Sequence, residues 1–356
     1  MLGISIYLNE PISDHQREYI HTMSNLGCRG IFTSLHIPED DPSLYATRLK
    51  ELGSLAKQYK MELVADISPK SLVYLGVTWE KAEKLKEWGI TGLRVDYGLS
   101  EELIANLSRK MKIALNASTL TEENVNKLKQ YNFIPSSVEA WHNFYPRPET
   151  GLDTKEFYQR NEWLKSEKLS VMAFIPGDGI RRGPLYKGLP TIEEHRDLTT
   201  FAAYLDFYHH PSVDKIFIGD PTICQSSAKQ FAYFKDGTIF LRAHPFTDDK
   251  RIMDRFKQIQ TNRLDAARDV IRSAESRLYG LMGDFSVEPY NTIDRPVGAI
   301  TVDNRLYGRY QGEIQITKRS LEADQKVNVI GQVIKEDLHL LNYIRGGTKF
   351  MIEWNE

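Results

Sequence analysis

The stretch Trp79–Gly98, WEKAEKLKEWGITGLRVDYG, contains the unit that recurs through the first two thirds of the chain. Its apolar residues follow one another at helical spacing: Trp79, Ala82, Leu85 and Trp88. Gly89 comes next, at the position where a left-handed C-cap ends a helix. The apolar run Gly92–Gly98 lies directly afterwards and predicts a strand. We therefore expect a helix that is followed closely by a strand.

Similar short apolar runs recur on both sides of this unit. Eight runs are expected to be strands: Leu2–Leu8, Gly30–His36, Glu62–Ser68, Gly92–Gly98, Lys112–Ser118, Ser137–Tyr145, Ser170–Gly177 and Lys215–Asp220. Helix-start patterns lie between them, as at Thr121 before two glutamates and as a capping box at Thr191-x-x-Glu194. Strands that alternate with helices in this number favour an α/β fold, a (β/α)8 TIM barrel, over a doubly wound sheet.

The pattern changes after Gly237. The remainder is predicted to contain one polar helix and a shorter helical segment, Asn262–Leu278 and Asp337–Ile344. Strands are expected at Gly298–Val302, Gly312–Thr317, Lys326–Val333 and Thr348–Trp354. Alternation in EIQIT and KVNVIGQV is typical of half-buried antiparallel strands. We expect a catalytic barrel domain at residues 1–237 and a smaller β-rich domain at residues 238–356.

Composition excludes several classes of protein. The chain has 356 residues, of which 41% are hydrophobic, and its 46 basic and 48 acidic residues give a net charge of −2, which argues against nucleic-acid and membrane partners. Its two cysteines, Cys28 and Cys224, form no C-x-x-C pair and suit a reducing compartment. The first residues do not resemble a signal peptide, and no apolar run reaches the roughly 18 residues of a membrane span. A cytoplasmic protein is expected.

A TIM barrel places its active site at the carboxyl-terminal ends of its strands. Polar side chains cluster at the predicted ends: Asn9, Glu10, Ser34, His36, Asp66, Ser68, Arg94, Asp96, Asn116, Ser118, Glu139, His142, Asn143, Tyr145, Asp178 and Asp220. Any one of them is explained equally well by a hydrogen-bonded network in the barrel mouth. The whole set facing one cavity favours a binding site.

Two predicted loops are rich in glycine, proline, arginine and aromatic residues: NFYPRPETGLD and IPGDGIRRGPLYKGLP. Their guanidinium groups suit a phosphate dianion, although a solvated basic rim would have the same composition: Arg147, Arg181 and Arg182. Aromatic side chains that suit stacking on sugar rings lie in or near the same loops: Trp141, Phe144, Tyr145 and Tyr186.

No cofactor or metal is expected. The first strand, ISIYLNE, lacks the lysine that a pyridoxal phosphate barrel requires, and no phosphate-binding or dinucleotide-binding glycine motif occurs. His36 and His142 are not part of any metal-binding spacing. Carboxylates remain, and a pair of them is the usual equipment for cleaving a glycosidic bond: Asp66, Asp96, Glu139 and Asp220. A phosphosugar isomerase or lyase, or a non-catalytic sugar-phosphate-binding protein, is the alternative.

Several strings in the sequence are similar to those of one enzyme family. They include SIYLNE, FTSLHIPEDD, LRVDYG, LNAST, NFYPRPETGL, FIPGDGIRRGPLYKGLPTIEEHR and RPVGAITVDNRLYGRYQGEIQI. In these strings the chain resembles the 6-phospho-N-acetylmuramidase family over essentially its whole length. The resemblance implies a TIM barrel followed by a cyclophilin-like domain. It also implies cleavage of N-acetylmuramic acid 6-phosphate from N-acetylglucosamine in cell-wall recycling, so the expected partner is a phosphorylated amino-sugar disaccharide.

Under this hypothesis Asp96 and Glu139 form the catalytic pair, with Asp66 and Asp220 as substitutes. A substrate-assisted mechanism, in which the acetamido oxygen attacks, is the alternative. The remaining polar residues are expected to bind substrate: Asn9, His36, Arg94, Asn116, His142, Asn143, Tyr145, Arg147, Arg181 and Arg182. The stereochemical outcome and the oligomeric state, a homo-oligomer included, are left open.

Overall fold

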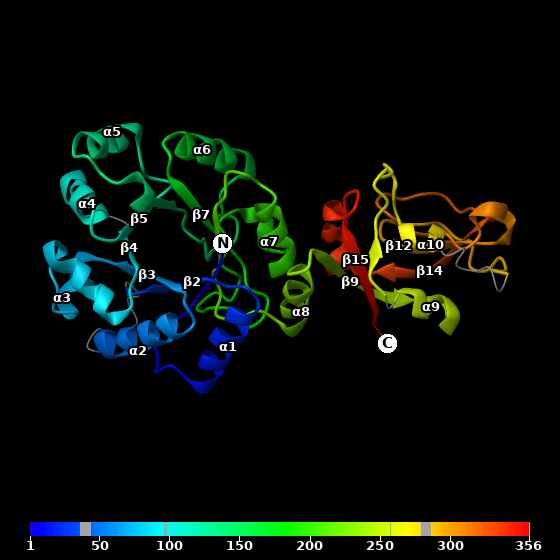
Figure 1. Cartoon of the computed structure of the whole chain (residues 1–356), viewed down its shortest axis with the longest axis horizontal. Coiled ribbons are helices and arrows are strands. Elements are labelled where there is room, and N and C mark those ends of the chain that lie inside the picture. The colour runs from blue at the N-terminus through cyan, green and yellow to red at the C-terminus, as the bar shows by residue number, and fades with distance from the viewer. Residues whose placement is uncertain (36–43, 96–97, 257, 279–285, 356) are drawn as a thin grey trace. The chain divides into compact units, whose positions relative to one another are not determined.

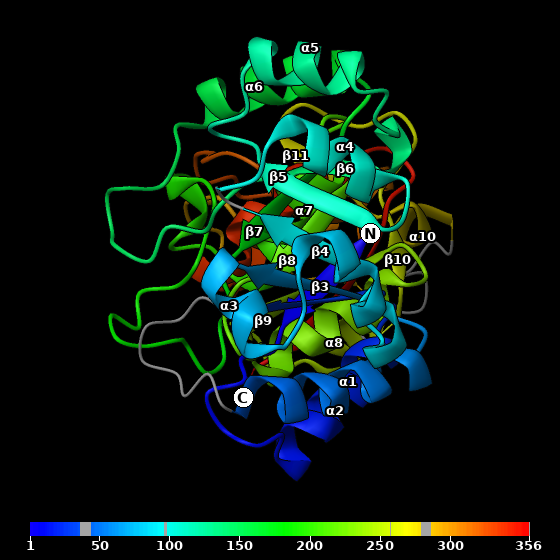
Figure 2. The ribbon, with the colours of Figure 1, turned by 90° about the vertical axis from the view of Figure 1, so that its left-hand side faces the viewer.

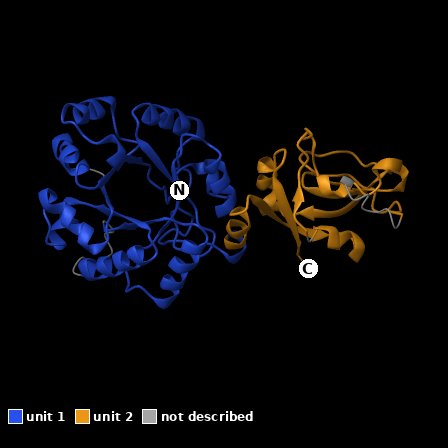
Figure 3. Ribbon diagram, in the orientation of Figure 1, with its two compact units in different colours: residues 1–227 blue, residues 228–356 orange. Residues whose placement is uncertain are grey.

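The computed structural model describes residues 1–35, 44–95, 98–256, 258–278 and 286–355. The chain forms two compact units, Met1–Ser227 and Ala228–Glu356 (Figure 3). The boundary falls inside helix α8 (Gln225–Phe234), somewhat before the position after Gly237 that the change of pattern indicates.

The described part of unit 1 is a closed barrel of eight parallel strands, which confirms the predicted α/β TIM barrel (Figure 1). The strands are β1 (Leu2–Ser5), β2 (Gly30–Ser34), β3 (Glu62–Ile67), β4 (Gly92–Val95), β5 (Lys112–Asn116), β6 (Val138–Trp141), β7 (Ser170–Ile175) and β8 (Lys215–Ile218). Each pairs with its successor, and β8 closes on β1 through Ile218 and Ile4. Most strands are shorter at their carboxyl ends than predicted.

Helices surround the barrel (Figure 2). They are α1 (Asp14–Asn25), α2 (Tyr45–Gln58), α3 (Pro69–Tyr74), η2 (Trp79–Trp88), α4 (Glu101–Ser108), α5 (Glu122–Gln130), η3 (Pro135–Ser137), α6 (Thr154–Ser166), η4 (Glu193–His195), α7 (Thr200–Tyr208) and α8. As predicted, Gly89 ends η2 in the left-handed conformation, with φ 94°, and α5 begins after Thr121; the capping box that Thr121 forms with Asn124 was not predicted.

The capping box predicted at Thr191 is wrong. The short helix η4 begins only after Ile192, and the Thr191 side chain has other partners. Its Oγ1 donates to the Asn143 carbonyl at 2.8 Å and accepts from the Phe174 amide at 2.8 Å. Thr191 therefore joins two strand ends instead of starting a helix.

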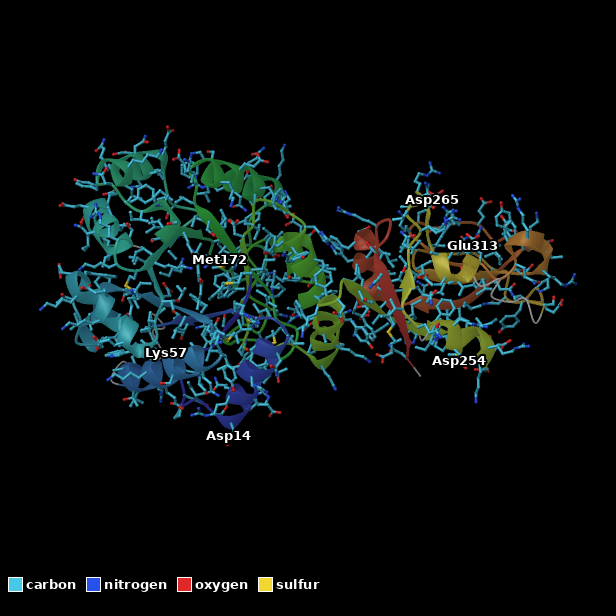
Figure 4. All side chains as sticks on the ribbon, viewed as in Figure 1. Asp14, Lys57, Met172, Asp254, Asp265 and Glu313 are labelled. Atoms are coloured by element: carbon cyan, nitrogen blue, oxygen red, sulfur yellow. The ribbon has the colours of Figure 1, made fainter. Side chains whose placement is uncertain are left out.

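The interior of the barrel is filled with apolar side chains. Phe32, Val64, Ala114, Trp141, Met172, Phe174 and Phe217 form one buried cluster, and Met172 lies near the centre of the barrel in Figure 4. A packed interior leaves no passage between the two ends of the barrel, so chemistry is confined to the ends.

Paired charges occupy the amino-terminal end of the barrel. Lys215, the first residue of β8, donates from Nζ to Glu62 Oε2 at 2.6 Å and to Glu139 Oε1 at 2.7 Å. Lys112, the first residue of β5, forms an ion pair with Glu62 and lies 3.6 Å from Glu139 Oε1. Trp141 Nε1 also donates to Glu139 at 2.7 Å. These four charged side chains are called the basal charge cluster below.

Unit 2 is the smaller β-rich domain that the sequence predicts. Its described residues form a seven-stranded sheet with the order β10-β15-β9-β14-β12-β13-β11. The strands are β9 (Thr238–Pro245), β10 (Gln260–Thr261), β11 (Val270–Arg272), β12 (Ala299–Asp303), β13 (Ile314–Thr317), β14 (Val327–Val333) and β15 (Lys349–Trp354). β15 and β9 pair in parallel, and the other pairs are antiparallel. The helices are α9 (Lys250–Phe256), α10 (Ala274–Leu278), η5 (Arg305–Tyr310) and η6 (Lys335–Tyr343).

The helix predicted at Asn262–Leu278 is wrong over most of its length. Val270–Arg272 is a strand that pairs with β13, so Ile271 lies opposite Ile316. Only Ala274–Leu278 is helical. Pairing with a distant strand overrides the local preference here. The strand β9 was also not predicted, because it begins at the residue after Gly237 where the pattern changes.

Candidate functional site

A cavity of about 870 Å³ opens at the carboxyl-terminal end of the barrel. Its walls come from the ends of β1 to β4, from the loops that follow β6, β7 and β8, and from α1. Its polar lining comprises Ser5, Tyr7, Asn9, Glu10, Ser13, His15, Gln16, Tyr19, Ser34, Asp66, Arg94, Asn143, Arg181, Arg182, Tyr186 and Thr222. The predicted residues Asn9, Asp66, Arg94, Asn143, Arg181 and Arg182 are therefore brought together.

A hydrogen-bonded group at the strand ends, Ser34, Asp66, Arg94 and Asn143, is called the floor cluster. Arg94 Nη1 donates to Asp66 Oδ1 at 2.9 Å, and Ser34 Oγ donates to Asp66 Oδ2 at 3.2 Å. Arg94 Nη2 also donates to Asn143 Oδ1. Asp66 and Arg94 are register partners on β3 and β4, with side chains only 15% and 6% exposed. The cluster fixes one carboxylate at the cavity.

The loop that follows β7, residues 176–192, supplies the two arginines of the lining and is called the β7 loop. The Arg182 guanidinium carbon lies 4.2 Å from the centroid of the Tyr7 ring and 6.0 Å from that of Phe144. Among the described residues, neither Arg181 nor Arg182 forms an ion pair. Two arginines without an ion-pair partner among the described residues thus border the cavity, and Arg181 is also attracted electrostatically by the buried Asp220 carboxylate.

Asp220, a predicted catalytic residue, lies behind the β7 loop and is fully buried. Its Oδ2 accepts from the Gly177 and Leu189 amides at 2.9 Å each, and its Oδ1 accepts from the Arg182 amide at 3.0 Å. Burial raises the pKa of Asp220 above its usual range, although these hydrogen bonds oppose the rise. The carboxylate does not line the cavity, so its visible role is to hold the loop.

Glu139 is at the opposite end of the barrel from the cavity. It is the second residue of the four-residue strand β6 and belongs to the basal charge cluster. The prediction used a strand that extends to Tyr145, in which Glu139 and Asn143 share a face. The two residues do share the face that points into the barrel. However, Asn143 comes after the carboxyl end of β6, whereas Glu139 lies before that end, near the start of the strand. The structure therefore does not bring Glu139 to Asp66.

His142 and Asn116 also lie outside the cavity. His142 is fully buried against α6, where its Nε2 lies 2.7 Å from Asn161 Oδ1 and its ring packs on Phe157. Burial lowers the pKa of His142 to about 4. Asn116 lines a separate small pocket between α4 and α5, and its Oδ1 accepts from the Ser118 amide at 3.0 Å.

Tyr145 and Arg147 are not among the cavity-lining residues. Their carbonyl groups accept from the Arg196 guanidinium, and the Tyr145 amide donates to the Pro190 carbonyl at 2.9 Å. His36 and Asp96 lie outside the described residues. Trp141 is buried in the barrel interior, which leaves Phe144 and Tyr186 as cavity aromatics among the four predicted.

Several lining residues were not predicted. Ser13 is the N-cap residue of α1, the helix after β1, and His15, Gln16 and Tyr19 lie within that helix. Nothing in their sequence separates them from ordinary helix residues. Tyr7 could have been selected, because it lies near the end of the first predicted strand, close to Asn9 and Glu10, which the sequence analysis does select. Selecting polar residues at the carboxyl-terminal ends of predicted strands therefore finds site residues in strands and loops but not those in helices.

Further features concern metals, membranes and thiols. In the described ranges, no group of three or more His, Cys, Asp and Glu side chains could hold a metal ion. No described helix is long and apolar enough to cross a membrane. Cys28 is buried, which raises the pKa of its thiol to about 12, whereas Cys224 is partly exposed.

A parallel eight-stranded barrel with an arginine-lined cavity at its carboxyl-terminal end defines a TIM-barrel protein with its site in the position usual for the fold. The sequence matches the description "6-phospho-N-acetylmuramidase, N-terminal" over residues 2–233 and "6-phospho-N-acetylmuramidase, C-terminal" over residues 239–353. The chain belongs to the 6-phospho-N-acetylmuramidase family, whose name describes glycosidases.

Two solved structures are similar over the whole chain. A conserved Enterococcus faecalis protein of unknown function is 44% identical, with a TM-score of 0.92, and the match covers 100% of this chain and 96% of that one. An uncharacterized B. cereus protein is 25% identical, with a TM-score of 0.75 and 99% of each chain covered. No curated protein matches the sequence significantly.

Proposed function

We propose that the protein hydrolyses the glycosidic bond between N-acetylmuramic acid 6-phosphate and N-acetylglucosamine. The observation that carries the proposal is the presence of Asp66 and of the guanidinium groups of Arg181 and Arg182 in one cavity. A carboxylate is needed for glycosidic cleavage, and paired N–H donors are suited to a phosphate dianion. The family to which the chain belongs supports the same activity.

The size and charge of the cavity fit this substrate. Its volume of about 870 Å³ lies in the range of ligand pockets, which is roughly 300–1,000 Å³. Arg94 is compensated by Asp66, so the positive charge available to a ligand comes from the β7 loop. Asn9 and Asn143 offer neutral amide groups for sugar hydroxyl and acetamido groups.

Asp66 is proposed as the carboxylate that acts at the anomeric carbon. Both of its oxygens accept hydrogen bonds from the floor cluster, so they are oriented to face developing positive charge and are poorly placed to carry a proton for the leaving group. The proposed proton donor is Asp96, which follows Val95 in the sequence and lies outside the described residues, or Glu10 in the cavity wall. Asp66 would orient the acetamido group if the reaction is substrate-assisted.

The test is incubation of the enzyme with the phosphorylated disaccharide and measurement of free N-acetylglucosamine. Asp66→Asn is expected to lower kcat by roughly 10²-fold or more, and one of Asp96→Asn and Glu10→Gln by a similar factor. Absence of product with the unaltered protein would refute the function. Near-normal turnover in all three variants would refute only the residue assignment.

The proposal includes a place in the cell. A phosphorylated cell-wall disaccharide is produced during import, so its hydrolysis belongs to cell-wall recycling in the cytoplasm. Cells that lack the protein are expected to accumulate the phosphorylated disaccharide, which mass spectrometry of cell extracts measures. The same proposal treats unit 2 as a cyclophilin-like domain without prolyl isomerase activity, because fold likeness does not imply activity.

A further inference from the structure

We infer that Arg182, rather than its neighbour Arg181, selects the phosphorylated sugar, and that Tyr7 and Asp220 are positioning residues that hold Arg182 against the cavity. The inference rests on the proposed function for the identity of the ligand. Its structural basis is the difference between two adjacent arginines that both line the cavity.

Arg182 is fixed at both its backbone and its side chain. Its amide donates to Asp220 Oδ1 at 3.0 Å. Its guanidinium lies over the Tyr7 ring at 4.2 Å. For Arg181, the described residues provide no hydrogen bond, ion pair or ring contact to the side chain. The Arg182 side chain therefore has a direct ring contact before a ligand arrives, whereas the described residues give the Arg181 side chain only an electrostatic attraction from Asp220.

The two positioning residues are connected to each other. Tyr7 is buried, and its hydroxyl donates to the Gly219 carbonyl at 2.6 Å. Gly219 directly precedes Asp220, whose Oδ2 accepts from Gly177 and Leu189 on the two sides of Arg182 in the β7 loop. The ends of β1 and β8 thus fix the ring under the guanidinium and the backbone that carries it.

This arrangement suits recognition of a phosphate group. The Arg182 guanidinium lies over the Tyr7 ring, and its N–H groups have no carboxylate partner among the described residues, so they can form a bidentate contact with phosphate oxygens. A side chain that is already ordered loses little conformational entropy on binding. Arg181 has no ring contact of this kind among the described residues, so we expect it to contribute less to the preference for a phosphorylated sugar.

Binding measurements on the full chain test the choice between the two arginines. Calorimetry compares N-acetylmuramic acid 6-phosphate, N-acetylmuramic acid and inorganic phosphate as ligands. Arg182→Ala is expected to reduce the preference for the phosphorylated sugar by about 10- to 150-fold, the range of a charge-assisted hydrogen bond, and Arg181→Ala by less than about 3-fold. Lys187→Ala is the control, because Lys187 is exposed on the same loop but does not line the cavity.

A larger loss of preference in Arg181→Ala than in Arg182→Ala would overturn the inference, as would equal losses in the two variants. Binding does not require turnover, so the two proposals fail separately. A protein that prefers the phosphorylated sugar but releases no N-acetylglucosamine would refute the proposed hydrolysis and keep the role of Arg182. Binding of inorganic phosphate alone, without a preference between the sugars, would count against a sugar-phosphate site.

A matched pair of variants tests the positioning role. Tyr7→Phe keeps the ring and removes the hydrogen bond to Gly219, whereas Tyr7→Leu removes the ring. We expect Tyr7→Leu to raise KM for the phosphorylated disaccharide about tenfold or more with little change in kcat, and Tyr7→Phe to stay near the unaltered protein. Asp220→Asn is expected to behave like Tyr7→Leu.

If Tyr7 and Asp220 had a merely structural role, their substitution would weaken the binding of phosphorylated and unphosphorylated sugars equally. The ratio of the two affinities is therefore the deciding measurement. An unchanged ratio in Tyr7→Leu would refute the positioning role of the ring. A fall in kcat without a rise in KM in Asp220→Asn would restore the catalytic role predicted for Asp220. Should Asp220→Asn fail to fold, the two Tyr7 variants decide the question.

Discussion

At the scale of single residues, the surroundings of a carboxylate decide what it can do. Asp66 and Glu139 both lie on barrel strands, but Asp66 borders the cavity and Glu139 belongs to the basal charge cluster. Asp220 follows a strand end at the correct side of the barrel and is occupied by three backbone amides. Only the first of the three is available to a ligand.

His142 gives a pH-dependent prediction. Its pKa of about 4 in the fold lies below the ordinary value of 6.5, so below pH 6.5 the unfolded chain binds a proton that the folded chain does not. The contribution of neutral His142 to the free energy of unfolding is complete above pH 6.5. Up to about 3 kcal/mol of it is lost as the pH falls to 4. Between pH 7 and pH 4.5, His142→Gln should lose less of its free energy of unfolding than the unaltered protein, as measured by urea unfolding. Equal losses would contradict the prediction.

For Asp303 in unit 2, the expected pH dependence of stability has the opposite sign to that of His142. Burial, and then repulsion from Glu313 and Asp324, raises the pKa of Asp303 to about 7, so the folded state keeps a proton that the unfolded chain releases above pH 3.8. Stability contributed by this group therefore falls as the pH rises from 3.8 to 7. Asp303→Asn is expected to raise the free energy of unfolding by roughly 2–4 kcal/mol at pH 8 and by clearly less at pH 5. A stabilisation independent of pH would contradict this cause.

Much of the site could be predicted from single residues. Asp66, Arg94 and Asn143 can be predicted because each lies at or just after a strand end, where the fold places its site, and Arg182 because its loop is rich in arginine and glycine. Glu139 and His142 were expected at the cavity and lie elsewhere. The length of β6 and the direction of each side chain depend on the closed barrel and not on local sequence. The α1 contribution could not be found without the path of the chain after β1.

At the scale of elements, two glycines allow α2 and η2 to approach closely. A Cβ on Gly53 of α2 would lie 1.6 Å from the Trp88 carbonyl oxygen, and one on Gly89 would lie 2.4 Å from the Gly53 carbonyl oxygen. Gly53→Ala must therefore separate the two helices, and it is expected to cost at least the roughly 1–3 kcal/mol of an overpacked site. Chemical denaturation measures the loss of stability.

Gly27 provides a matched control for Gly89. The two residues have similar φ angles, 96° and 94°, but a Cβ on Gly27 has no neighbour within 4 Å. Gly27→Ala should cost only the left-handed conformation of an alanine, about 1–2 kcal/mol. Gly89→Ala adds the steric cost, so equal losses in the two variants would show that close approach of the helices is not the cause.

The elements themselves were predicted unevenly, for physical reasons. The barrel strands are recognisable because strands buried on both faces are continuous apolar runs. In unit 2, the sequence predicts a helix across β11, because its three residues, Val270–Arg272, are too few to show alternation and depend on β13 for their conformation.

At the scale of the whole molecule, unit 1 separates stability from chemistry between the two ends of its barrel. Glu139→Gln removes a carboxylate from the basal charge cluster and is expected to lower the free energy of unfolding by about 1.5–3 kcal/mol. Its kcat and KM should be unchanged, because the packed interior lies between Glu139 and the cavity. Thermal unfolding and steady-state kinetics on the same preparation measure both quantities.

Asp66→Asn is the reciprocal control, since it should lose turnover and keep most of its stability. The separation would be disproved if Glu139→Gln lost turnover while its unfolding midpoint stayed unchanged. That result would return Glu139 to the catalytic pair that the sequence suggested.

The unequal burial of the two cysteines has a practical consequence. Cys28 keeps its proton at neutral pH and is shielded from solvent, whereas Cys224 is accessible two residues after Thr222 in the cavity wall. Thiol-reactive dyes should therefore attach at a single place in the native protein without any engineering. A fluorophore there would sense occupation of the barrel mouth directly, which offers an optical assay for inhibitors even where no product is formed.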